Sequence, residues 1–236
     1  MNGGILQSAA ALDLLGRMQE TRAQNLANAN TVGYRKRISS AEVFAATLRR
    51  AAGLTLPGLK QSIDFTPGNF QQTGNSLDLA IDGGAFFALE TERGMRFTRN
   101  GNFSLDAGGF LVASDGARVA GENGPVQADP ARGEVEIDRR GAVLQDGEPI
   151  GTLRLVEFRN QQRLAPDESG RFRDPAGADP FDSVDSSVKQ GYLEMSNVNG
   201  IDEMIQMISG MRAFEAAQKA LVGIDKIRAM GVSSNG

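Results

Sequence analysis

Carboxylates are the side chains in this sequence with the clearest potential for chemistry. Asp78 and Asp82 stand four residues apart before Gly83, as in the first half of a calcium-binding loop. Such a loop also needs oxygen ligands at its third and twelfth positions, where this chain has Ala80 and Leu89. The pattern therefore predicts a turn after residue 82 and no calcium site.

Two closer carboxylate pairs could act as general acid and base. Glu134 with Glu136, and Asp182 with Asp185, have the residue types that flank the scissile bond in glycosidases. That chemistry depends on the distance between the carboxyl groups, which sequence spacing does not fix. Pairs of this kind usually lie on a solvated surface, so an enzyme remains only a competing hypothesis.

Composition excludes most other catalytic and metal sites. The 236 residues include no His and no Cys, so a Ser-His-Asp triad, a thiolate nucleophile and a Cys-based metal site are impossible. We expect no cofactor and no metal. The 25 basic residues against 29 acidic residues give a formal charge of −4, which does not favour nucleic acid as a partner.

Two short segments at and near the N-terminus indicate neither a polyanion-binding site nor a cleaved signal. The basic run Arg35-Lys36-Arg37 is too short for a polyanion site and predicts a solvated helix exit or a salt bridge between subunits. The start Met1-Asn2-Gly3-Gly4 lacks the basic residues of a cleaved signal peptide. No stretch approaches the length of a membrane span, so we expect neither signal cleavage nor membrane insertion.

The N-terminal segment predicts a helix over residues 5–26, where Ala, Leu, Gln, Arg and Met dominate and Pro is absent. Its apolar stripe comprises Ile5, Ala9, Leu12, Leu15 and Met18. The Asn-rich segment that leads to Gly33 should end the helix, because Asn and Gly readily adopt left-handed backbone. Taken alone, this pattern favours a helix that packs on its own domain.

The C-terminal segment predicts one long helix over residues 199–230, with Asn199 as its cap. A spacing of three and four residues, typical of a coiled-coil seam, relates Met204, Met207, Met211, Phe214, Leu221 and Ile224. Further apolar positions widen this face beyond what one short helix covers, so we expect other chains to cover it. Docking of the helix on the central domain is the alternative.

The middle of the chain predicts an all-β domain. Short β-rich runs alternate with Gly-containing turns, and Asn-Gly or Asp-Gly pairs such as Asn100-Gly101 and Asp146-Gly147 favour hairpins. The predicted organisation is a helix at 1–35, an extended linker at 36–74, the β-domain at 75–165, a return connector at 166–195 and a helix at 196–236. The predicted fold class is α+β, with the N- and C-terminal helices paired as a coiled-coil-like stalk beside the β-domain.

Three ordered motifs resemble those of the flagellar basal-body rod and hook family. The first is Asn25-Leu26-Ala27-Asn28-Ala29-Asn30-Thr31-Val32-Gly33-Tyr34-Arg35. The second runs from Thr73-Gly74-Asn75-Ser76-Leu77-Asp78-Leu79-Ala80-Ile81 to Phe97-Thr98-Arg99-Asn100-Gly101-Asn102-Phe103. The third is Leu193-Glu194-Met195-Ser196-Asn197-Val198-Asn199, followed by Arg212-Ala213-Phe214-Glu215. The modest length argues against the hook protein, and the span 124–158 is more similar to proximal than to distal rod members.

The resemblance implies a structural subunit, not an enzyme, of the rod that drives the bacterial flagellum. Such subunits leave through the flagellar export apparatus without a cleaved signal and assemble in the periplasm. The expected partners are copies of the chain and other rod proteins in a helical filament. The residues expected to carry self-assembly are Ile5, Leu12, Leu15, Leu26, Asn28, Gly33, Tyr34, Asn197, Met204, Ile208, Met211, Phe214 and Leu221.

Three alternatives remain open at this point. A distal rod subunit is the nearest one. A β-rich carbohydrate-active or peptidoglycan-processing enzyme with helical appendages is the second, and a binding module formed by residues 75–165 is the third. In the leading interpretation the terminal helices of an isolated subunit lack cover, so we expect them to be largely mobile in the monomer.

Overall fold

The protein is represented by a computed structural model that describes residues 3–39, 61–167, 170–175 and 177–233. These residues form two compact units, each described by itself. The helical unit comprises the described residues within 1–29, 36–64 and 198–236. The β unit comprises those within 30–35 and 65–197. Residues 40–60, most of the predicted linker, lie outside the described residues.

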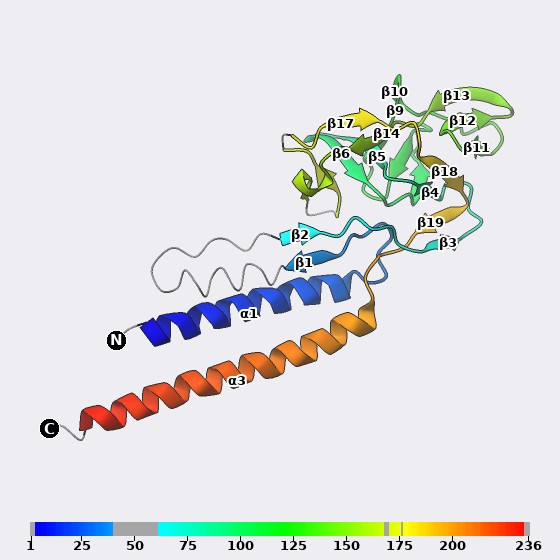
Figure 1. Cartoon of the computed structure of the whole chain (residues 1–236). Coiled ribbons are helices and arrows are strands. Elements are labelled where there is room, and N and C mark those ends of the chain that lie inside the picture. The colour runs from blue at the N-terminus through cyan, green and yellow to red at the C-terminus, as the bar shows by residue number, and fades with distance from the viewer. Residues whose placement is uncertain (1–2, 40–60, 168–169, 176, 234–236) are drawn as a thin grey trace. The chain divides into compact units, whose positions relative to one another are not determined.

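The helical unit contains helix α1 (Gly3–Ala27), helix α3 (Gly200–Ser233) and a hairpin of strands β1 (Arg37–Ser39) and β2 (Gln61–Ile63), as Figure 1 shows. The buried face of α1 carries Leu14, Thr21 and Asn25, and α1 contacts β1. The Asn25 side chain accepts a hydrogen bond from the Arg37 amide at 2.9 Å and donates one to the Arg37 carbonyl at 2.8 Å. A side-chain amide thereby joins the end of α1 to the start of β1.

Local signals set the boundaries of both helices. Asn199 Oδ1 accepts hydrogen bonds from the amides of Ile201 and Asp202, at 3.1 and 3.4 Å, so the predicted cap of α3 is confirmed. Asp202 and Glu203 lie in the first turn, near the positive end of the helix dipole. Beyond α1, Gly33 has a φ of +69°, the left-handed conformation that its residue type predicted.

The predicted fold class, with terminal helices paired as a coiled-coil-like stalk, is wrong. The described chain is mostly β-sheet, with two α-helices of unequal length and one helix at its C-terminal end. Where α1 and α3 meet, Gln19 Nε2 donates to the Met207 carbonyl at 2.8 Å and Arg22 donates to the Gln206 carbonyl at 2.7 Å. Polar side chains that bind a helix backbone are not the interlocking apolar side chains of a coiled coil.

The contact beside Gly210 explains why such a seam does not form. Gly210 is buried, and a Cβ at this position would collide with the side chains of Arg22 and Gln19. The two long polar side chains therefore occupy the space where apolar side chains of a coiled coil would interdigitate. The sequence pattern alone did not indicate a polar contact here, because Met207 and Met211, which flank Gly210 along the chain, both fit the predicted apolar seam.

The β unit is built from antiparallel strands (Figure 1). In chain order they are β3 (Phe70–Gln72), β4 (Leu79–Asp82), β5 (Phe86–Thr91), β6 (Gly94–Thr98), β7 (Phe103–Leu105), β8 (Leu111–Ala113), β9 (Arg118–Gly121), β10 (Gly124–Pro125), β11 (Val135–Ile137), β12 (Ala142–Gln145), β13 (Glu148–Thr152), β14 (Leu155–Phe158), β15 (Ala165–Pro166), β16 (Phe172–Arg173), β17 (Pro180–Asp182), β18 (Ser187–Gln190) and β19 (Tyr192–Glu194). A short 3-10 helix, η1 (Gln161–Arg163), follows β14.

The largest sheet has the strand order β15-β16-β6-β5-β9-β8-β7, with β10 paired to β9 and β14 paired to β5 and β17. A second sheet has the order β11-β12-β13, and two further pairs are β18-β4 and β19-β3. The described parts of segments 36–74 and 166–195 therefore contain strands as well as connections. Two of these strands, β18 and β19, bring the returning chain beside β4 and β3.

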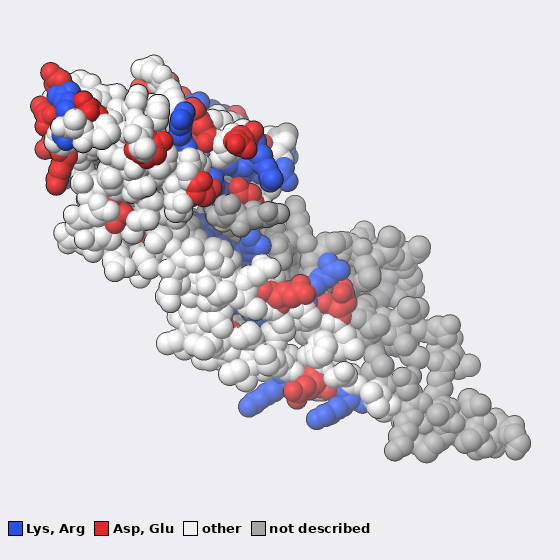
Figure 2. All heavy atoms as spheres, turned by 180° about the vertical axis from the view of Figure 1, so that it is seen from behind, with Lys and Arg blue, Asp and Glu red and all other residues white. Residues whose placement is uncertain are grey.

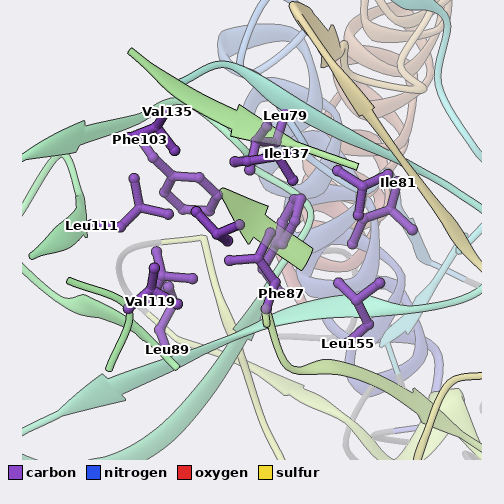
Figure 3. Packing of buried hydrophobic residues seen from close by; sticks show 14 of the residues in the cluster. Leu79, Ile81, Phe87, Leu89, Phe103, Leu111, Val119, Val135, Ile137 and Leu155 are labelled. Atoms are coloured by element: carbon purple, nitrogen blue, oxygen red, sulfur yellow. The ribbon is translucent and has the colours of Figure 1, made fainter. Parts of the chain in front are cut away.

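A large apolar cluster forms part of the core of the β unit. Figure 3 shows Leu79, Ile81, Phe87 and Leu89 packed together with side chains from the other strands. The rings of Phe87 and Phe103 meet edge to face, with centroids 5.1 Å apart. The enclosed side chains leave water almost completely, which provides the main driving force for folding this unit.

Turn signals in the β unit correspond to hairpins at some places and not at others. Asp146-Gly147 joins the paired strands β12 and β13, and both residues have positive φ, as a type I′ turn requires. Asn100-Gly101 joins β6 and β7, which do not pair with each other. Gly101 instead passes so close to the Leu79 carbonyl that a Cβ would collide with it. Long-range packing, not the local turn signal, fixes that connection.

Candidate functional site

One side of α3 exposes large apolar side chains. The residues on this side recur at three, four and seven positions, which places them on one helix face. We call them the α3 apolar face: Ile201 (66% exposed), Met204 (44%), Ile205 (57%), Ile208 (53%) and Met211 (52%). An apolar side chain that leaves a third or more of its area in water gains little free energy from folding. It would gain more if another surface covered it.

The predicted C-terminal seam is divided between two sides of α3. Met207 and Phe214 are half-buried and lie on the same side as the buried residues Glu203 and Gly210, where α1 contacts the helix. Met204 and Met211 belong to the exposed α3 apolar face together with Ile208. The structure therefore brings Met204, Ile208 and Met211 together and separates them from Phe214. The side chain of Leu221 lies outside the described residues.

The predicted N-terminal stripe also differs from the buried face of α1. Leu12, Leu15 and Leu26 are half-buried, whereas Leu14 is only 5% exposed. The side chain of Ile5 lies outside the described residues. Beyond Leu14, the buried face of α1 consists of the polar residues Thr21 and Asn25, which donate hydrogen bonds to backbone carbonyls. Apolar periodicity does not indicate such residues. Helix α1 therefore offers less apolar surface than the stripe indicated.

The remaining predicted residues hold backbone segments in place. Asn28 donates to the Gln24 carbonyl at the end of α1, at 2.8 Å. In the β unit, Gly33 and Tyr34 are buried, and the Asn197 side chain donates to the Thr66 carbonyl at 3.0 Å. A Cβ at Gly33 would collide with the backbone of Asn100, so only glycine allows this approach. These residues therefore hold backbone within their own units, and they do not extend the α3 apolar face.

The basic run after α1 is the clearest failure of the sequence interpretation. The Arg35 side chain is 2% exposed and lies 2.7 Å from Glu194 Oε1. Lys36 Nζ lies 2.6 Å from Glu203 Oε1, whose side chain is also 2% exposed. These residues form internal ion pairs in place of a solvated exit. A signal was available, because Glu194 is a lone carboxylate between Leu193 and Met195 at the end of a β-rich run.

The carboxylates considered for chemistry lie on the surface. Glu134, Glu136, Asp182 and Asp185 are all exposed, and Asp182 is 3.1 Å from the Arg154 guanidinium. On the face of the molecule in Figure 2, Lys and Arg lie among Asp and Glu without a continuous patch of one sign. Among the described residues, neither helix combines the length and hydrophobicity needed to cross a bilayer.

Comparisons with known families identify two regions of the chain. Residues 80–145 match the family described as "Flagellar hook protein FlgE/F/G D1 domain". Residues 189–229 match the family described as "Flagellar basal body rod FlgEFG protein C-terminal". The first region covers most of the apolar core of the β unit, and the second includes β19 and the α3 apolar face.

Whole-length relatives extend this match. The chain is 33% identical to the flagellar basal-body rod protein FlgG of Bacillus subtilis, over 95% of this chain and 93% of the relative. This chain belongs to the flagellar basal-body rod protein family. It is 31% identical to FlgF of Mesorhizobium japonicum, over 91% of this chain and 90% of that protein. It is also 31% identical to FlgF of Escherichia coli, over 95% of each chain.

Family membership settles the main hypotheses from the sequence. The resemblance to rod proteins, including those of the proximal rod, is confirmed. The chain is a structural subunit of the flagellar basal-body rod and assembles with other rod components, and proteins of this family are not enzymes. The hypothesis of a peptidoglycan-processing enzyme is therefore set aside.

Proposed function

We propose that the subunit joins the rod through the α3 apolar face, which binds copies of this chain and neighbouring rod subunits. One observation carries the proposal: five large apolar side chains on one side of α3 are each at least 44% exposed. Burying a Leu, Ile or Met side chain stabilises an interface by about 1.5–3 kcal/mol. A head-to-tail contact that does not close into a ring produces an open filament, as a rod requires.

Two features of the face suit packing against non-identical neighbours. Met204 and Met211 lie seven residues apart on this face, and methionine adapts its shape to different surroundings. A few strongly buried anchors usually provide most of the free energy of an interface. We therefore expect Ile208, which lies between the two Met residues along the helix, to act as an anchor.

We also propose the proximal rod as the position of this subunit. The alignment with FlgF of M. japonicum takes 218 positions for 91% of this chain, so it contains almost no insertions. At the same 95% coverage of this chain, the alignment with FlgF of E. coli takes 245 positions and that with FlgG of B. subtilis takes 255, so FlgG carries the larger insertions relative to this chain. A distal rod position is the alternative. The position of a tagged subunit in isolated basal bodies would distinguish the two.

The export route is a further part of the proposal. A rod subunit assembles beyond the cytoplasmic membrane, and family membership supports passage through the flagellar export apparatus. We expect the chain to be retained inside cells in which that apparatus is disabled. Fractionation of such cells tests this, and secretion at the normal level would contradict it.

The test of the assembly surface is Met211→Asp in a strain without the native copy, with incorporation into isolated basal bodies as the measurement. A buried carboxylate without a partner opposes association, so we expect incorporation to be lost while the isolated chain keeps its circular dichroism spectrum. The matched control is Ala213→Asp, which places the same charge at an exposed position two residues further along, on a different side of α3. Normal incorporation of Met211→Asp, or equal loss in both variants, would contradict the assignment of this face.

A further inference from the structure

Glu194 lies at the end of β19 and its side chain is fully buried. Its Oε1 is 2.7 Å from Arg35 Nη2 and accepts a hydrogen bond from the Gly68 amide at 2.9 Å. Its Oε2 accepts a hydrogen bond from Arg99 Nε at 2.8 Å. We call Glu194, Arg35 and Arg99 the Glu194 cluster.

The backbone around the cluster is equally constrained. The Glu194 carbonyl accepts a hydrogen bond from the Gly33 amide at 2.7 Å. A Cβ at Gly33 would collide with the backbone of Asn100, and a Cβ at Gly68 would collide with the Met195 carbonyl. The two glycines therefore permit two separate segments of chain to approach Glu194 closely.

Burial of the Glu194 cluster carries a large free-energy cost, because its charged groups lose their contact with water. It places two guanidinium groups and one carboxylate in the interior, which leaves one buried positive charge in excess. Arg99 also donates to the carbonyls of Ala85 and Ile81, whereas Nε and Nη1 of Arg35 have no hydrogen-bond partner among the described residues. Apolar residues of similar volume commonly stabilise a fold as well as such ion pairs do. The arrangement therefore calls for an explanation other than stability.

The course of the chain provides that explanation. The chain passes between the helical unit and the β unit at residues 29–30, 35–36, 64–65 and 197–198. Gly33 and Arg35 lie between the first two passages, Gly68 follows the third, and Glu194 precedes the fourth. One carboxylate residue therefore joins the segments next to all four passages.

We propose that Glu194 is a positioning residue for rod assembly. Together with Arg35 and Arg99, it holds the four segments that lead to the helical unit at one point of the β unit. The proposal rests on assembly through the α3 apolar face. A subunit in a lattice must engage several neighbours at once, and each flexible connection would have to be ordered during that step. The Glu194 cluster orders the connections before assembly, when the β unit folds.

The decisive variant is Arg35→Met in the full-length chain. It leaves one carboxylate and one guanidinium in the interior, so the buried charges balance and the β unit should still fold. The ion pair between segment 30–35 and Glu194 is removed, while the hydrogen bond from the Gly33 amide to the Glu194 carbonyl can remain. We expect hydrogen exchange of the amides in 30–35 and 66–72 to accelerate at least tenfold, while amides of β5 and β9 exchange as in the native chain.

Two further variants separate positioning from general stability. Arg154→Met removes an exposed ion pair with Asp182 in the same unit and should leave exchange unchanged. Arg35→Lys keeps a cation that can reach Glu194 and should restore most of the protection. Unchanged exchange in 30–35 of Arg35→Met, or acceleration that extends equally to β5, would overturn the positioning role.

Incorporation into basal bodies completes the test. We expect Arg35→Met to incorporate at least tenfold less than the native chain, and Arg35→Lys to recover most of that loss. Normal incorporation of a variant whose segment 30–35 exchanges rapidly would overturn the link between positioning and assembly. The result for Met211→Asp is measured separately, so failure of this inference would leave the proposed assembly surface intact.

Discussion

The α3 apolar face and the Glu194 cluster reverse the usual distribution of residue types in a folded protein. On α3, apolar side chains are exposed by up to 66%, while in the β unit three charged side chains are each at most 2% exposed. Neither arrangement stabilises the isolated subunit. Exposure of apolar side chains to water is unfavourable, and burial of charged side chains away from water is also unfavourable. Both are consistent with a molecule whose working state is an assembly.

The two regions contribute in different ways. The α3 apolar face has no directional groups, so it provides free energy of association in proportion to the area that neighbours cover. The Glu194 cluster consists of directional, charge-assisted hydrogen bonds, which fix the geometry of the segments that they join. The comparison teaches that adhesion and orientation are separate properties, carried by separate residues.

The largest expected effect is that of Glu194→Gln on the stability of the β unit. The substitution leaves two buried guanidinium groups without a carboxylate, and breaking a buried pair in this way costs about 3–5 kcal/mol. Urea unfolding of the full chain, followed by circular dichroism, measures the loss. Asp182→Asn is the control, because this carboxylate is 73% exposed and its pair with Arg154 should contribute about 0–1 kcal/mol. Equal losses in both variants would remove the distinction between the cluster and the surface.

A smaller effect is expected from Gly33→Ala. The substitution introduces a side chain at a φ of +69° and in collision with the Asn100 backbone, so we expect a loss of about 2 kcal/mol in the free energy of unfolding. Gly74→Ala is the matched control, since Gly74 has a φ of +76° with open space around its Cβ position. It should lose about 1 kcal/mol through the backbone term alone. If Gly74→Ala were the more damaging, segment 30–35 would not be closely packed.

One contribution to acid sensitivity should come from Asp115. Burial tends to raise the pKa of this carboxyl, but hydrogen bonds from the Arg171 side chain and the Ala117 amide hold the pKa below its usual range. A lowered folded-state pKa stabilises the fold fully above about pH 4, and this contribution is lost as pH falls through the lower value. Asp115→Asn should therefore lose less stability than the native chain between about pH 4 and pH 2. Parallel acid titrations followed by circular dichroism would show the difference, and identical curves would contradict it.

The smallest expected change in monomer stability is that of Ile208→Gln. Its side chain is 53% exposed, and a surface substitution usually shifts the free energy of unfolding by no more than about 0.5 kcal/mol. Urea unfolding at a concentration where the chain is monomeric measures this. Incorporation into basal bodies should nevertheless fall, because the anchor is lost. A large loss of monomer stability would show that the α3 apolar face is already covered within one subunit.

Local features of this fold were predictable where a few neighbouring residues decide the structure. The cap at Asn199, the left-handed Gly33 and the hairpin at Asp146-Gly147 all follow from residue type over a short stretch. The Asn100-Gly101 turn shows the limit of that reasoning. Its dipeptide favours a hairpin, but the Leu79 backbone packs against it and the adjacent strands pair elsewhere.

The candidate site was only partly predictable. Spacing identified the apolar residues of the C-terminal helix, but it placed Met207 and Met211 in one seam, although only Met211 is strongly exposed. The reason is that polar side chains of α1 occupy the groove beside Gly210. Periodicity reports which residues are apolar, whereas the partner helix determines which of them are covered.

The sequence by itself determined the family, the positions of both helices and of a β-rich middle, and the absence of His and Cys chemistry. These features depend on residue types and on contacts within a few positions along the chain. Only the tertiary structure decided which side of α3 stays exposed and that Arg35 and Arg99 meet Glu194. The physical reason is distance along the chain: Arg99 and Glu194 are 95 residues apart in sequence, and folding of the whole β unit is needed to bring their charges together.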